Sequence, residues 1–174
     1  LMDAWIHRHK QLDFDEDGAW AASGEVSEKL LKAMLQEPFF QLPPPKSTGR
    51  ELFNLKWLEQ FPTIETLRPE DVQATLADLT AHTISDAIRQ HAPDTEVVYV
   101  CGGGAYNKHL MSRLEAVLDG YQLADISGLG MEADRIEAMA FAWLARRTLM
   151  NLHGNLPEVT GAEDELILGG IYRK

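Results

Sequence analysis

The sequence has 174 residues, of which 45% are hydrophobic and 25% charged, values that suit one globular domain with its own core. The formal net charge of −11 argues against a nucleic-acid partner, because phosphate binding needs clustered Lys and Arg. The single cysteine, Cys101, excludes an internal disulfide framework, and no apolar run reaches the roughly 20 residues that span a bilayer. With no signal peptide evident, we expect a cytoplasmic protein that binds neither nucleic acid nor membrane.

A first helix is expected over residues 1–9, with Leu1, Trp5 and Ile6 on one face. Chains usually begin with a few disordered polar residues, so this start suggests the later part of a longer protein. The acidic segment 13–18 (DFDEDG) predicts a solvated turn or a helix cap. It resembles a calcium loop only faintly, since the glycine and the closing glutamate of an EF-hand are misplaced.

A second helix is expected over residues 27–36, ending at Pro38. Three prolines in the segment 39–54 favour extended backbone. Within that segment two cations, two hydroxyls and a glycine follow one another: Lys46, Ser47, Thr48, Gly49 and Arg50. Such a loop suits an anion such as phosphate, and a polar connector is the alternative.

A short helix is predicted over residues 53–61 and a long one over residues 70–90. In the long helix apolar or small residues recur at helical spacing: Val72, Leu76, Leu79, Thr83, Ile84 and Ile88. This pattern predicts one buried face along the whole helix.

The segment 97–101 (VVYVC) is mostly apolar and β-prone, which predicts a buried strand that ends at a core cysteine. Three glycines follow at once, Gly102, Gly103 and Gly104, and Asn107 opens a helix over residues 109–118. A strand, a glycine-rich turn and a helix bring backbone N–H groups close to a nucleotide. Glycine also leaves no Cβ in the way of a ligand.

A second strand over residues 121–126 and a helix over residues 134–150 complete the pattern. The alternation of helix and strand predicts an α/β fold with parallel neighbouring strands. We expect the last helix to bury Ile136, Met139, Ala140, Trp143 and Leu144. Asp134 and Glu137 stand three apart in its first turn, where they are either dipole partners or catalytic carboxylates on one face.

The established nucleotide motifs fit this chain poorly. It has no Walker loop, and counting G-x-G-x-x-G from Gly102 puts Asn107 at the third glycine. Asp125 does stand about twenty positions on, where a dinucleotide fold has its ribose partner. A nicotinamide-dependent oxidoreductase half therefore remains one alternative, and a non-catalytic module is another.

Together the motifs resemble the C-terminal part of anhydro-N-acetylmuramic acid kinase. The segments that carry the resemblance are LMDAW (1–5), DGAWAASG (17–24), PPKSTGRELFN (44–54), DVQATLADLTAHTI (71–84), VCGGGAYN (100–107), EAMAFAWLA (137–145) and NLPEVTGA (155–162).

The resemblance implies the C-terminal lobe of an actin-like, Hsp70-like (ribonuclease H-like) sugar kinase, spanning residues 1–174. It implies ATP and Mg²⁺, and phosphorylation of O6 of 1,6-anhydro-N-acetylmuramic acid with hydrolytic opening of the anhydro bridge in murein recycling. Gly102, Gly103, Gly104 and Asn107 fall in its adenosine motif. Glu137 falls at a carboxylate that faces the sugar, and Asp134 at the neighbouring acidic position. We expect Lys46, Ser47 and Thr48 to contact the nucleotide, and no protein metal ligands.

The family's N-terminal lobe and its catalytic aspartate precede the segment that matches Leu1. The 174 residues alone are therefore expected to lack kinase activity. The resemblance also allows a homodimer. The apolar tail 166–172 either contributes to that dimer or fills the domain's own core through a strand at Leu166, Ile167 and Leu168, which is the interpretation we favour.

Overall fold

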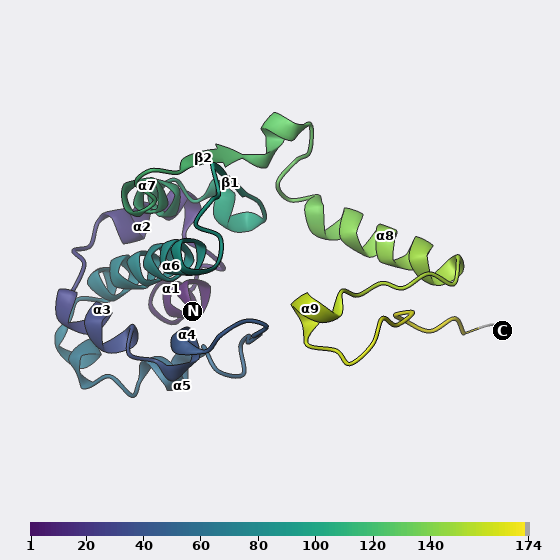
Figure 1. The fold of residues 1–174 in the computed structure, drawn as a ribbon. Helices are drawn as coiled ribbons and strands as arrows, with labels where there is room; N and C mark the ends of the chain where they lie inside the picture. Colours follow the sequence, from purple (N-terminus) through teal and green to yellow (C-terminus); the bar gives the residue numbers. More distant parts are fainter. Residues whose placement is uncertain (173–174) are drawn as a thin grey trace.

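The computed structural model describes residues 1–172, which form an α/β fold of many helices and a small two-stranded parallel sheet (Figure 1). In chain order the elements are α1 (Met2–Lys10), α2 (Ala19–Ala22), α3 (Glu28–Met34), α4 (Pro38–Gln41), α5 (Leu55–Leu58), α6 (Pro69–His91), β1 (Val97–Val100), α7 (Lys108–Val117), β2 (Gln122–Asp125), α8 (Ile136–Leu149) and α9 (Pro157–Thr160). Short 3₁₀ turns lie at Glu16–Gly18, Pro62–Thr66, Gly103–Tyr106 and Ile126–Leu129. Among the described helices, none is both long and apolar enough to cross a membrane.

The long helix α6 is the centre of the helical body, and its prediction is confirmed to within one residue at each end. Its first half is buried on every side, from Asp71 to Leu79, because α1, α2 and α3 all pack around it. The second half is buried on one side only, and Ile84 is 37% exposed. The single buried face predicted from the sequence therefore underestimates the burial of the first half of α6.

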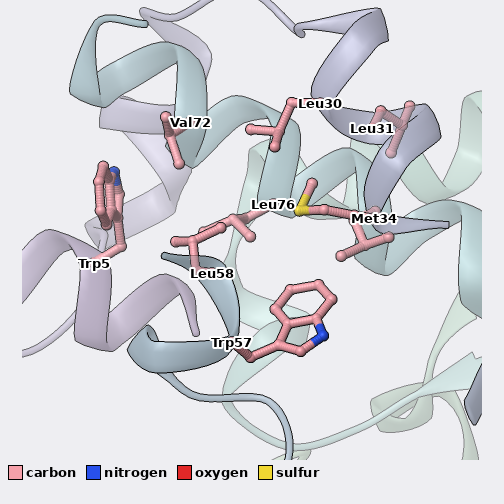
Figure 2. Packing of buried hydrophobic residues seen from close by; sticks show 9 residues of the cluster. Trp5, Leu30, Leu31, Met34, Trp57, Leu58, Val72 and Leu76 are labelled. Atoms are coloured by element: carbon pink, nitrogen blue, oxygen red, sulfur yellow. The ribbon is translucent and has the colours of Figure 1, made fainter. Parts of the chain in front are cut away.

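Side chains from the three helices α1, α3 and α6 and from the single turn α5 fill the main core (Figure 2). The cluster consists of Trp5, Leu30, Leu31, Met34, Trp57, Leu58, Val72, Leu76 and Leu79. Full burial of one such side chain contributes about 1.5–3 kcal/mol. The indole N–H of Trp5 also donates to the carbonyl oxygen of Pro69 at 2.8 Å, which fixes α1 against the start of α6.

The two strands are parallel, as predicted, with Val97 opposite Gln122 and Val100 opposite Asp125. The crossover between them is α7, which packs on α6 through a second cluster: Ala81, Leu110, Leu114 and Leu118. This crossover sets the glycine turn at the carboxyl end of β1, directly before α7.

Several sequence expectations are wrong in detail. β1 ends at Val100 and is only half-buried, and Cys101 is exposed rather than part of the core. α3 ends at Met34, while Pro38 begins the separate helix α4, so Phe39 and Phe40 are helical instead of extended. The helix expected over residues 53–61 is the single turn α5.

The last helix differs most from its prediction. α8 begins at Ile136, so Asp134 lies in the turn before it. None of its residues is buried, and the expected inward residues Met139 and Trp143 are each 51% exposed. In Figure 1 α8 extends away from the helical body, and the segments that pack beside it within the described chain leave all of its residues at least partly exposed.

The described part of the tail forms no strand, which overturns the expectation for residues 166–172. Leu166 and Ile167 are 53% and 45% exposed, and Tyr172 is 96% exposed. The tail instead folds back beside the end of α8, where the Thr148 hydroxyl donates to the Leu168 carbonyl oxygen, and the Leu166 N–H donates to Asn155 Oδ1 at 2.6 Å. Residues 173 and 174, which follow this tail in the sequence, lie outside the described residues.

Candidate functional site

A cavity of about 1060 Å³ lies where the helical body meets the glycine turn. Segments far apart in the sequence form its wall: the start of α1, the acidic turn, the loop before α5, the middle of α6, the glycine turn and the first turn of α8. Its charged lining residues are Asp3, Asp15, Glu16, Asp17, Arg50 and Glu137. The cavity therefore combines one cation with five carboxylates.

The glycine turn forms one wall through Gly103, Gly104 and Asn107. Gly102 has φ 80° and ψ −177°, a conformation that is essentially restricted to glycine, and its N–H donates to the Ala133 carbonyl oxygen at 2.8 Å. A Cβ added at Gly103 would meet no atom within 4 Å, so packing within the chain does not require a glycine there. Open space beside the backbone is what a close-lying ligand would need.

Asn107 has a structural role beside the cavity. Its Oδ1 accepts the Leu110 N–H at 2.9 Å and caps α7, as expected of a residue that opens a helix. The helix therefore begins directly after the turn, and the orientation of the turn is coupled to α7.

Hydrogen bonds fix the acidic turn, residues 13–18, against α2 and the start of α7. Asp15 is buried and accepts the N–H groups of Trp20 and Ala21, each at 2.9 Å, so it caps α2. The Lys108 ammonium donates to Asp17 Oδ2 at 2.7 Å, and this contact raises the pKa of Lys108. The cap that the sequence predicts is confirmed, and the turn joins the start of α7 to the start of the chain.

A buried polar group lies behind this turn. His109 packs with its Nε2 unpartnered, and burial together with the nearby Arg113 charge lowers the pKa of its imidazole. The Oε1 atom of the fully buried Gln73 also lacks a partner among the described residues. Arg113 itself donates to the buried Asp78 at 2.5 Å, which keeps that carboxylate paired.

Only one of the two candidate carboxylates, Glu137, lines the cavity. Glu137 lies in the first turn of α8 and lines the cavity together with the glycine turn. Asp134 is exposed in the preceding turn and does not line the cavity. The expectation that both stand on one face of a helix is wrong, because the helix begins two residues after Asp134.

The 46–50 loop reaches the cavity through Arg50 and not through the residues named from the sequence. The Lys46 ammonium donates to the carbonyl oxygens of Phe39 and Phe40 at 3.1 and 3.0 Å. The Thr48 hydroxyl donates to Glu51 Oε1 at 3.2 Å, and Ser47 is exposed outside the cavity lining.

Comparison with known proteins identifies the family. The family profile described as anhydro-N-acetylmuramic acid kinase matches residues 1–174. The chain belongs to the anhydro-N-acetylmuramic acid kinase family. Proteins of that name from Xanthomonas campestris pv. campestris and Ralstonia nicotianae are each 51% identical to it, and one from Coxiella burnetii is 47% identical. Each match covers 99% of this chain and 46% of the relative, so the chain spans about half the length of these relatives.

Membership in the anhydro-N-acetylmuramic acid kinase family removes the support for the oxidoreductase alternative. Asp125, which that alternative required, lies in a separate hollow of about 410 Å³ with Lys108 and Ser112. Its Oδ1 accepts the Ser127 N–H at 2.7 Å and caps a 3₁₀ turn.

Magnesium is implied by a kinase of this family, but the described residues do not make a site for it alone. Within residues 1–172 no group of three or more His, Cys, Asp or Glu side chains is arranged to hold a metal ion. Mg²⁺ commonly binds one or two carboxylates together with substrate phosphates and waters.

Two parts of this cavity were not identified fully from the sequence. The acidic turn was interpreted as a solvated turn or a helix cap, and nothing local indicates that it also meets α7, because Asp17 and Lys108 are 91 positions apart. Arg50 belonged to the loop that was predicted to suit an anion, but it was not among the three residues of that loop expected to contact the nucleotide.

Proposed function

We propose that this chain is the C-terminal lobe of an actin-like sugar kinase that acts in the cytoplasm on 1,6-anhydro-N-acetylmuramic acid. ATP would donate its γ-phosphoryl group to O6 of the sugar, while water adds at C1 and the C1–O6 bridge opens, giving N-acetylmuramate 6-phosphate for murein recycling. The observation that supports this proposal is the shared cavity: Gly103, Gly104 and Glu137 line one space although α8 is separate from the turn in sequence.

The residues of this chain would bind and orient the two substrates. The turn at Gly102–Gly104 offers open backbone for the nucleotide, and the Asn107 cap fixes that turn to α7. Glu137 would accept a hydrogen bond from a sugar hydroxyl and hold the ring against the nucleotide wall. Phosphoryl transfer depends mainly on such positioning and on charge stabilisation, so small displacements of these groups reduce the rate.

The nucleotide part is tested by Gly103→Ala in the complete kinase that carries this chain. The added Cβ meets nothing within 4 Å and the backbone needs no positive φ, so the melting temperature should not change. If the turn holds ATP, the KM for ATP should rise by about 10-fold or more. Gly128→Ala is the matched control, because that glycine is equally open and lies outside the cavity lining. An unchanged KM for ATP in Gly103→Ala would contradict the proposed turn.

The sugar part is tested by comparing Glu137→Gln with Asp134→Asn. We expect Glu137→Gln to lower kcat/KM for the sugar by about 100-fold, a typical loss for a positioned carboxylate. Asp134→Asn should lower it several-fold at most, because that side chain does not line the cavity. Equal losses in both variants would contradict the geometry of the proposed site.

The lobe assignment predicts that residues 1–174 alone do not phosphorylate the sugar. Closure of two lobes assembles a kinase site and excludes water, and a single lobe cannot do so. The measurement is product formation by the isolated chain and by the complete kinase at equal concentration. Turnover by the isolated chain at a comparable rate would refute the assignment.

A further inference from the structure

Arg50 is the one residue with a cationic side chain among the cavity-lining residues of the described chain. It shares that lining with Asp3, Asp15, Glu16, Asp17 and Glu137. A phosphate or a carboxylate entering such a space meets repulsion from these acidic groups. A ligand with an anionic group therefore needs a cation in the wall, and Arg50 is the residue in position to supply it.

The Arg50 side chain is available for this task. It takes part in none of the ion pairs formed within residues 1–172, and the residue is exposed. Its backbone is nevertheless fixed, because its carbonyl oxygen accepts the Asn54 side-chain amide at 3.0 Å. The same Asn54 caps α5 by accepting the Lys56 N–H at 2.9 Å. An anchored backbone with an unengaged guanidinium is a suitable arrangement for binding a ligand.

Lys46, Thr48 and Gly49 of the same loop already have hydrogen-bond partners within the described chain. Lys46 is held by two carbonyl oxygens and lies 5.1 Å from the centre of the Phe39 ring. The Gly49 N–H donates to Glu51 Oε1 at 2.6 Å, and the Thr48 hydroxyl donates to the same atom. These hydrogen bonds shape the loop, and among its residues Arg50 alone lines the cavity.

We infer that Arg50 is an anion-binding residue of this cavity, whose guanidinium fork takes a carboxylate or phosphate group of a bound ligand. Arginine matches both groups in bidentate geometry, which a lysine cannot do. The inference rests on the proposed function for the identity of the ligands. These carry two such groups, the carboxylate of the muramic acid side chain and the phosphates of ATP.

The test is Arg50→Gln in the complete kinase, with 1,6-anhydro-N-acetylmuramic acid and 1,6-anhydro-N-acetylglucosamine as sugars. The second sugar lacks the carboxylate. If Arg50 binds the carboxylate, the KM for the acidic sugar rises by about 10- to 100-fold, while the KM values for the neutral sugar and for ATP stay the same. If it binds a phosphate, the KM for ATP rises by a similar factor with either sugar.

Two further variants support the interpretation. Arg50→Lys keeps the charge without the fork and should give an intermediate KM. Lys29→Gln removes one exposed positive charge outside the cavity lining and should leave every KM unchanged. If Arg50→Gln matches Lys29→Gln in all KM values, the inference is overturned.

The proposed function can fail separately. If the wild-type kinase turns over neither sugar, the proposed function is wrong. Calorimetric titration of wild type and Arg50→Gln with ATP and with the acidic sugar then decides the role of Arg50. Weaker binding of either probe to the variant supports it, and equal or absent binding refutes it.

Discussion

Replacing Gly18 by alanine should disturb the contact between the acidic turn and the start of α7. Gly18 has φ +70°, a left-handed conformation that alanine adopts poorly. A Cβ built there would lie 2.1 Å from Asn107 Oδ1 and 2.7 Å from the Cβ of His109. Real Cβ atoms do not approach other atoms so closely, so the turn and the helix must move apart.

The expected loss follows from two separate terms. The left-handed backbone costs an alanine about 1 kcal/mol. Overpacking against α7 adds about 1–3 kcal/mol, and part of this is the displaced Asn107 cap. We therefore expect the free energy of unfolding to fall by about 3 kcal/mol. With an m-value near 2 kcal/mol per molar urea, the midpoint should fall by roughly 1.5 M.

The assay is urea unfolding of the chain followed by far-ultraviolet circular dichroism. Gly120→Ala isolates the backbone term, because Gly120 has φ +91° and nothing within 4 Å of the added Cβ, so it should lose only about 1 kcal/mol. The double variant Gly18→Ala with Asn107→Ala should lose less than the sum of the single losses, because it removes the nearest colliding atom. A Gly18→Ala loss no larger than that of Gly120→Ala would refute the packing argument.

Three further predictions concern stability. Gly24→Ala should destabilise by about 3 kcal/mol in urea unfolding, since its Cβ would lie 2.1 Å from a backbone carbonyl oxygen of α6, and a loss below about 1 kcal/mol would contradict this contact. Asp71→Asn should destabilise at pH 7, because the hydrogen bonds from Arg68 lower the pKa of Asp71. That advantage of the wild type should shrink as the pH falls below about 4, and a difference independent of pH would count against it. His109 has a lowered pKa, so the unfolded chain binds the extra proton, and wild-type stability should rise with pH through about 6.5. His109→Gln should reduce the rise of stability with pH and leave only the part that comes from His9, whose pKa is also lowered by burial. An unchanged pH dependence would argue against burial as the cause of the lowered His109 pKa.

Local patterns predicted the elements whose cause is local. The helical spacing from Val72 to Ile88 gave α6 almost to the residue, and Asn107 was correctly placed at the opening of α7. The parallel pairing of β1 and β2 followed from the order of helix and strand. These features depend on residues close together in the chain or on general rules of connection.

The features that failed depend on what packs from elsewhere. The apolar residues of α8 recur at the spacing of a buried face, yet Trp143 is half exposed, because the Arg147 guanidinium lies over its ring and no apolar layer of the described chain buries it. Cys101 follows an apolar strand and is exposed for a similar reason. In the candidate site, Glu137 and the glycine turn were predicted, whereas the acidic turn enters through a contact between distant residues that no local pattern encodes.

The attachment of α8 has a mechanical consequence for the cavity. The helix has 14 residues and, at about 1.5 Å per residue, is about 21 Å long. Just before the helix begins, the Ala133 carbonyl oxygen accepts the Gly102 N–H, and Glu137 is the second residue of the helix. A tilt of about 5° at the base would move the far end by on the order of 2 Å and Glu137 by only a few tenths of an ångström. Glu137 thus lies close to the point about which α8 would tilt. Tilting of the exposed helix would therefore leave the distance between Glu137 and the glycine turn nearly constant.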